Sequence, residues 1–295
     1  MREFQYFAPK SLPEALSLAE QYGAECALLA GGTDLVVQMK RGDRSPACVV
    51  NLKTVPGLND ISYSQDEGLL VGPLATHDAL VEHPIIHEQF GILAEAASSV
   101  GTFQVRERGT IGGNICNGSP AADTVPPLIC LGAKLKLQSA NRGERQVPVE
   151  EFFESPQVTK RAPDEVLTLI QIPNVADRTG AVYLKLGKRK ALEIAVVGVA
   201  ALITLNDNGS ACIGAKVSLA SVAPTPIRSR KAEELLIGQK LDERIIDEAA
   251  LAAQQEAVPI SDLRSSAEYR SEMVYVLAKR ALSIAFERAK GNSAK

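Results

Sequence analysis

Short apolar runs, separated by polar turns that contain glycine, make up the first 55 residues of the chain. Residues 11–23 carry apolar side chains at helical spacing, after a serine and before a glycine, which predicts a capped helix. Residues 26–30 and 47–53 are predicted to be short buried strands, and residues 34–42 a helix that ends in a glycine. The pattern predicts a small α/β unit.

The middle of the chain changes to a mixture of helical periodicity and strand alternation. Residues 68–83 predict a strand, a Gly-Pro turn and a helix, and residues 91–101 a second helix bounded by glycines. Residues 133–139 alternate apolar and polar side chains, as a half-exposed strand does, and the segments that begin at Glu165 and Gly180 continue this alternation. We expect helices with an antiparallel or mixed sheet.

The last third of the chain predicts a hairpin followed by helices. Residues 194–205 and 212–223 are apolar strands on either side of an Asn-Asp-Asn-Gly turn. Amphipathic helices are predicted over residues 231–239, 244–257 and 265–290. The predicted fold class is therefore α+β.

Three regions follow from these elements, with boundaries predicted at 1–55, 56–175 and 176–290. The first two read as α/β and mixed units, and the third as a separate α+β domain.

Composition excludes several classes of function. The net charge is -3 and aromatic residues make up 4 %, so nothing favours binding of nucleic acid. No apolar run is long enough to span a membrane, and the N-terminus lacks a signal peptide, which predicts a cytoplasmic protein without a transmembrane segment. The five cysteines are odd in number and widely spaced, as reduced thiols are. The three histidines could include a metal pair, but a solvated helix or loop face is the default, and no metal site is predicted.

Two glycine-rich stretches carry the candidate chemistry. Gly31 and Gly32 follow a predicted strand and precede a predicted helix, where bare backbone N–H groups favour phosphate. Glycine can also serve such a turn through its backbone angles alone, and Thr33 and Asp34 can either cap the helix or bind a ligand hydroxyl. The stretch matches neither the dinucleotide fingerprint nor the P-loop.

The second stretch, residues 109–128, again joins a Gly-Gly pair to small polar residues. A helix is expected to begin near Asp123 with the following prolines in its first turn, so Asp123 is either its N-cap or a carboxylate for sugar hydroxyls. Two such stretches suggest one long ligand that has two phosphates and a polyol chain.

These motifs, "LLAGGTDL", "GTIGGNICNGSPAAD", "PDEVLTLIQIP" and "YLKLGKRKALEIAVV", occur in an order that resembles the FAD-binding medium subunit of the molybdenum hydroxylases, the xanthine dehydrogenase and carbon monoxide dehydrogenase family. The resemblance covers nearly the whole chain. It implies a two-part FAD-binding domain of the vanillyl-alcohol-oxidase (PCMH) type, followed by a C-terminal domain with a small antiparallel sheet and helices.

The resemblance also implies the residues that contact FAD. The diphosphate is assigned to Leu28, Leu29, Ala30, Gly31, Gly32, Thr33, Asp34 and Leu35. The diphosphate and ribityl region is assigned to Thr110, Gly112, Gly113, Asn114, Asn117 and Ser119. Asp123 would bind ribityl or ribose hydroxyls, Leu167 would pack against the isoalloxazine, and Lys185 would lie near the ring. From the residues alone, Lys185 reads as an exposed strand lysine.

By resemblance, the chain takes electrons from a small [2Fe-2S] subunit and passes them from FAD to an external acceptor, while a large subunit carries the molybdenum cofactor. A dimer of heterotrimers is the expected assembly. No side chain need act as acid, base or nucleophile, because the flavin does the chemistry. A docking scaffold with little or no redox role is the alternative. A self-contained flavin oxidase is disfavoured, because no substrate domain with acid–base residues can be identified.

Overall fold

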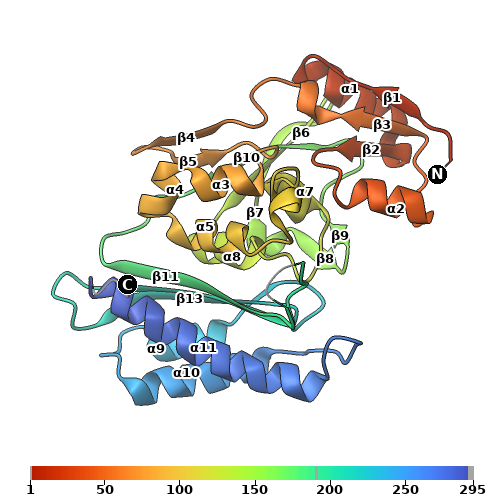
Figure 1. Ribbon diagram of the computed structural model, residues 1–295. Helices are drawn as coiled ribbons and strands as arrows, with labels where there is room; N and C mark the ends of the chain where they lie inside the picture. Colours follow the sequence, from red (N-terminus) through yellow and green to blue (C-terminus); the bar gives the residue numbers. More distant parts are fainter. Residues whose placement is uncertain (1, 190–191, 292–295) are drawn as a thin grey trace.

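The computed structural model describes residues 2–189 and 192–291, and its elements are arranged in layers (Figure 1). A small sheet lies at the N-terminal end, a five-stranded sheet with helices beneath it lies in the middle, and a four-stranded sheet lies above the last helices. Among the described residues, no helix combines the length and apolar character needed to cross a membrane.

The N-terminal layer is a parallel sheet of order β1-β3-β2 with two helices. Its elements are β1 (Gln5–Phe7), α1 (Leu12–Tyr22), β2 (Cys26–Leu29), α2 (Leu35–Arg41) and β3 (Cys48–Asn51). The Ser11 hydroxyl accepts a hydrogen bond from the Glu14 amide at 3.3 Å, and Gly42 ends α2 in the left-handed conformation. The predicted helices and strands of this layer are confirmed. Strand β1 was not predicted, because three residues are too few to show an alternation of apolar and polar side chains.

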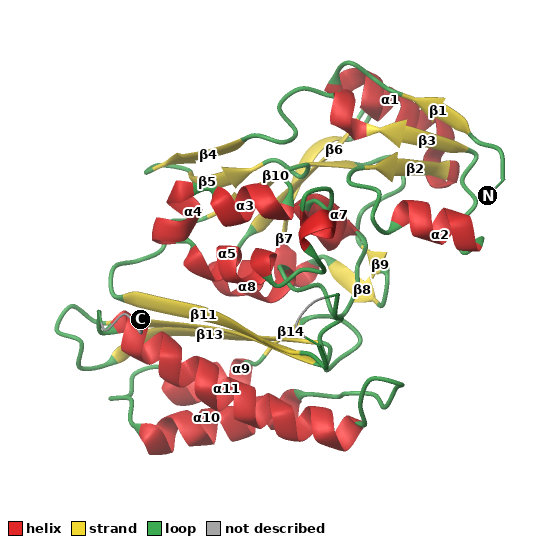
Figure 2. Ribbon diagram, viewed as in Figure 1, coloured by secondary structure: helices red, strands yellow, loops and turns green. Residues whose placement is uncertain are grey.

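The middle layer is an antiparallel sheet of order β4-β5-β10-β6-β7, covered by helices on one face (Figure 2). Its strands are β4 (Ile61–Ser64), β5 (Gly68–Val71), β6 (Lys134–Ser139), β7 (Gly143–Pro148) and β10 (Val166–Ile172). Its helices are α3 (His77–Glu82), α4 (Pro84–Gln89), α5 (Gly91–Ser98), α6 (Phe103–Arg106), α7 (Ile111–Cys116) and α8 (Val125–Leu131). A small hairpin is formed by β8 (Phe153–Ser155) and β9 (Val158–Thr159), and short 3₁₀ turns lie at Gly23–Glu25, Leu52–Thr54 and Val149–Glu151.

The C-terminal layer is an antiparallel sheet of order β11-β12-β13-β14. Its elements are β11 (Thr179–Leu186), β12 (Val197–Leu205), β13 (Cys212–Ala220), β14 (Ile227–Arg228), α9 (Arg230–Leu236), α10 (Glu243–Glu256) and α11 (Ala267–Ala289). The predicted hairpin and helices are thereby confirmed. The strand that contains Gly180 belongs to this sheet, although its alternation continues that of the middle region.

Both faces of the C-terminal sheet are buried. Helices α5 and α8 of the middle layer pack on one face, and α9 and α11 pack on the other, with α10 packed against these two helices (Figure 2). Along β12, Ala200 belongs to the middle core, whereas Val199 and Ala201 belong to the C-terminal core. This double burial is the reason why β12 reads as a continuous apolar run.

In the second glycine stretch, the structure excludes one of the two alternatives for Asp123 and contains a helix that was not predicted. Helix α8 begins at Val125 with Thr124 in the N-cap position, so Asp123 does not cap it. In addition, Gly112 and Gly113 lie inside α7, a short helix that was not predicted, because glycine has a low helix propensity. Thr110 is the N-cap of this helix, and its hydroxyl accepts from the Gly113 amide at 3.0 Å.

Candidate cofactor-binding site

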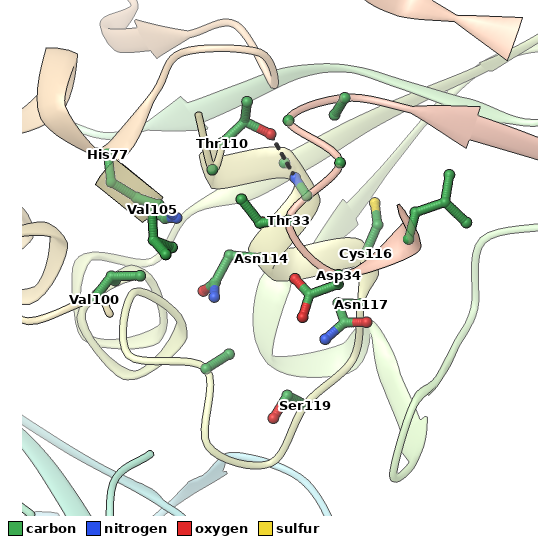
Figure 3. A pocket seen from close by; sticks show the side chains of 18 of the residues that line it. Thr33, Asp34, His77, Val100, Val105, Thr110, Asn114, Cys116, Asn117 and Ser119 are labelled. Carbon is green, nitrogen blue, oxygen red and sulfur yellow. Dashed lines mark hydrogen bonds between the residues drawn. The ribbon is translucent and has the colours of Figure 1, made fainter. Parts of the chain in front are cut away.

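A cavity of about 530 Å³ lies where the two glycine stretches meet, and it extends to the C-terminal domain. Its walls come from the loop between β2 and α2, from α7 and the loop that follows it, and from residues 192–194. Figure 3 shows Thr33, Asp34, Asn114 and Asn117 around this space. Its volume falls within the range of cofactor sites.

The first glycine stretch offers free backbone donors to the cavity. In the described part of the chain, the backbone N–H groups of residues 31–35 donate to no protein acceptor. Gly32 has a φ of +80°, a conformation that favours glycine and turns the chain sharply between β2 and α2. Asp34 occupies the N-cap position of α2 but makes no capping hydrogen bond. The loop therefore suits an anionic group such as a diphosphate.

In the second stretch, the amides around the Gly-Gly pair already have acceptors within the protein. The amide of Ile111 donates to Ala75 O at 3.0 Å, and that of Gly112 donates to Pro73 O at 2.9 Å. The Gly113 amide is taken by the hydroxyl of Thr110. Hence α7 and the loop that follows it offer the cavity mainly side-chain groups, which in this part of the wall are those of Asn114, Asn117 and Ser119.

The two stretches touch each other, and Gly31 makes the contact possible. A Cβ atom on Gly31 would lie 1.9 Å from Arg108 O, which is far inside van der Waals contact. A second link joins Gln38 Nε2 of α2 to Asn117 Oδ1 after α7, at 3.4 Å. Glycine at this position thus allows the two backbones to enclose one cavity.

A buried polar cluster joins the cavity to the C-terminal domain. The Asp123 carboxylate accepts from the Tyr183 hydroxyl at 2.8 Å and from Lys185 Nζ at 2.7 Å. Lys185 Nζ also donates to Ser99 O at 2.9 Å. Burial raises the pKa of Asp123, while the Lys185 ammonium and the two hydrogen bonds oppose that effect. Burial and the Asp123 charge raise the pKa of Tyr183 well above its usual value.

The structure gathers nearly all the predicted site residues around this cavity. Its wall contains Leu28, Ala30, Gly31, Gly32, Thr33, Asp34, Leu35, Thr110, Gly112, Gly113, Asn114, Asn117, Ser119, Asp123 and Leu167. Leu29 lies apart, because its side chain packs against the cluster of Ala27, Leu35, Met39 and Val49. Lys185 is not part of the wall and is held behind Asp123, with only 12 % of its side chain exposed, so the interpretation as an exposed lysine is wrong.

Several wall residues were not predicted. His77 was expected on a solvated face, yet the residue is only 2 % exposed and forms part of the cavity wall (Figure 3). Its Nδ1 is buried and has no hydrogen-bond partner among the described residues. Arg44 and Arg161 also line the cavity. Nothing in the local sequence distinguishes these residues, because only the tertiary fold brings them here.

Because His77 is buried, we expect the protein to lose stability in acid. Burial and the neighbouring Arg106 charge lower the pKa of His77 to about 4, from 6.5 in the unfolded chain. The unfolded state therefore binds the proton first as the pH falls, and between pH 7 and pH 5 the free energy of unfolding should decrease by about 2 kcal/mol from this residue. Urea unfolding of the wild type and His77→Gln at both pH values measures the difference. Equal pH dependence in the two proteins would contradict the prediction.

No metal site competes with this cavity in the described part of the chain. Within it, no group of three or more His, Cys, Asp or Glu side chains is placed to hold a metal ion. Cys26, Cys48, Cys116, Cys130 and Cys212 are all free. Cys116 lies in the cavity wall, and burial raises the pKa of its thiol, so it is held as a neutral thiol.

Comparison with known protein families agrees with this geometry. The family described as "FAD binding domain in molybdopterin dehydrogenase" matches residues 2–175, and the family described as "CO dehydrogenase flavoprotein C-terminal domain" matches residues 182–285. The first match contains both glycine stretches, and the second contains most of the four-stranded sheet and the last helices.

Individual relatives match over nearly the full length. The carbon monoxide dehydrogenase medium chain of Hydrogenophaga pseudoflava is 35 % identical over 97 % of this chain and 98 % of that protein. A putative xanthine dehydrogenase FAD-binding subunit of Escherichia coli strain K12 is 31 % identical over 97 % of both. A solved carbon monoxide dehydrogenase structure from Hydrogenophaga pseudoflava superimposes with a TM-score of 0.93, at 33 % identity over 97 % of this chain and 98 % of that chain.

The fold and the family matches thus define a flavoprotein that has an FAD-binding domain and a flavoprotein C-terminal domain. FAD is the cofactor, and the protein is an oxidoreductase subunit. The chain belongs to the family of FAD-binding subunits of molybdenum-containing dehydrogenases, as the sequence motifs predicted.

Proposed function

We propose that this chain is the electron-transfer subunit of a molybdenum hydroxylase, taking electrons from a [2Fe-2S] subunit and passing them to an external acceptor. One observation supports this most: the cavity has free backbone donors for a diphosphate at one segment and reaches the C-terminal domain at another. FAD bound there would supply the redox chemistry, since its ring can accept and release electrons.

We further propose how the chain holds FAD along this cavity. The amides of residues 31–35 would bind the diphosphate, and Asn114, Asn117 and Ser119 would bind the diphosphate and ribityl region. Asp123 would accept from ribityl or ribose hydroxyls, and Leu167, at an irregularity in β10, would pack against the ring. For Leu29 only the backbone is available to the cofactor. Lys185 would hold the Asp123 carboxylate in place and would bring its positive charge near the flavin ring.

The partners belong to the same proposal. The relative from Hydrogenophaga pseudoflava is a medium chain, a name that implies larger and smaller chains beside it. A large subunit with the molybdenum cofactor and a small subunit with [2Fe-2S] clusters are therefore proposed, in a dimer of heterotrimers. The cytoplasmic location and the boundaries near residues 55 and 175 remain predictions.

A purified chain tests the redox role. We expect a flavin absorption spectrum that dithionite bleaches and that organic substrates alone do not. Adding the reduced [2Fe-2S] subunit should bleach the flavin as well, whereas the same subunit in its oxidised form serves as the control. A chain that stays colourless after FAD is added would favour the docking scaffold, and bleaching by an organic substrate alone would indicate an oxidase.

A further inference from the structure

Two arginines at one side of the cavity have no role in the site as predicted from the sequence. Arg44 follows α2, and Arg161 follows β9 in a distant part of the chain. Both line the cavity together with Gly31 and the residues that follow it. The fold thus places two arginines on the wall of the cavity that also contains the backbone donors of the first glycine stretch.

Neither guanidinium group is neutralised by the described part of the protein. Neither lies within 4.0 Å of a carboxylate there. The two acids that follow Arg161 in sequence have other partners: Asp164 is paired with Arg142 at 3.2 Å, and Glu165 with Arg145 at 2.6 Å. Partial burial and the Arg161 charge both lower the pKa of Arg44, so the two cations disfavour each other.

Arg161 is also fixed in position. Its Nη1 donates to Ala162 O at 3.0 Å and to Glu165 O at 2.7 Å. Backbone carbonyls orient the guanidinium group without cancelling its charge. Two like charges on one cavity wall, without a carboxylate partner in the described chain, are the expected arrangement of an anion subsite.

We propose that Arg44 and Arg161 bind the diphosphate of FAD, together with the amides of residues 31–35. This inference rests on the proposed placement of FAD in the cavity. A diphosphate is the anionic group of FAD, and guanidinium groups match its paired oxygens in geometry and charge. The two arginines then provide most of the electrostatic part of FAD affinity.

The experiment titrates FAD into flavin-free protein at low and at high salt. The Arg44→Gln/Arg161→Gln double variant should bind FAD about 100-fold more weakly at low salt, since each charge-assisted contact is worth about tenfold. Its affinity should also depend much less on salt than that of the wild type. The Arg44→Lys/Arg161→Lys variant keeps both charges and should recover much of the affinity.

Two further variants separate charge from folding. Arg44 makes no hydrogen bond within the described chain, so Arg44→Gln alone should keep the fold and still lose about tenfold in affinity. Arg41 lies at the exposed end of α2 outside the cavity wall, and Arg41→Gln should bind FAD as the wild type does.

Three outcomes can be told apart. Wild-type affinity in the double glutamine variant would overturn the role of the arginines. A loss that lysine does not rescue and that leaves the salt dependence unchanged would also overturn it, since packing would then be the cause. A wild-type chain that binds no FAD would instead overturn the proposed placement of the cofactor.

Discussion

Replacing Asp123 with alanine is expected to lower the free energy of unfolding by about 3–5 kcal/mol, because the change leaves a buried charge unpaired. Asp123 is only 6 % exposed, and its carboxylate accepts hydrogen bonds from both Tyr183 and Lys185. Without it, the Lys185 ammonium keeps only the Ser99 carbonyl. Urea unfolding of the full chain measures the loss.

The matched control adds Lys185→Met to Asp123→Ala. This double variant lacks both charges and should be more stable than Asp123→Ala alone, because no unpaired charge remains buried. Asp123→Ala should also reduce FAD content, since the carboxylate lines the cavity. A loss below about 1 kcal/mol, equal in the single and double variants, would contradict the buried ion pair.

Replacing Gly31 with alanine should abolish most FAD binding and destabilise the protein by about 3 kcal/mol or more. The added Cβ would lie 1.9 Å from Arg108 O and 2.7 Å from Arg108 C. Both atoms belong to the backbone, so no side chain can rotate away and the two glycine stretches must separate. Flavin content after purification and thermal unfolding would report the change.

Gly91→Ala is the control for this substitution. Gly91 begins α5, and a Cβ at this position meets no atom within 4 Å. Its stability and flavin content should match those of the wild type or exceed them slightly, since alanine is the better helix former. Gly31→Ala protein with normal flavin content and stability would show that the close contact between the stretches is not required.

The elements with a long, clear period could be predicted. The last helix, α11, and the β12–β13 hairpin each carry enough periodic residues to define their type. Two short elements could not be predicted. Strand β1 has three residues, and α7 contains two glycines, so neither has a local pattern that separates it from a loop.

Some residues of the site could be predicted from the sequence, and others could not. The glycine-rich segments and Asp123 stood out because their residue types are unusual between a strand and a helix. His77 and Arg161 carry no such local signal. Asp123 itself shows the limit, because the prolines after it suggested a cap, whereas its partners Tyr183 and Lys185 lie about 60 positions further along the chain.

The order of residues alone determined the α+β class, the confirmed helices and strands and the two glycine-rich segments, because these depend on side-chain period and backbone freedom within a few positions. Only the tertiary structure decided which amides stay free, that Gly31 meets Arg108, and that two arginines with no carboxylate partner among the described residues share one cavity. Those properties depend on the distances and burial between segments remote in sequence, which local periodicity does not contain.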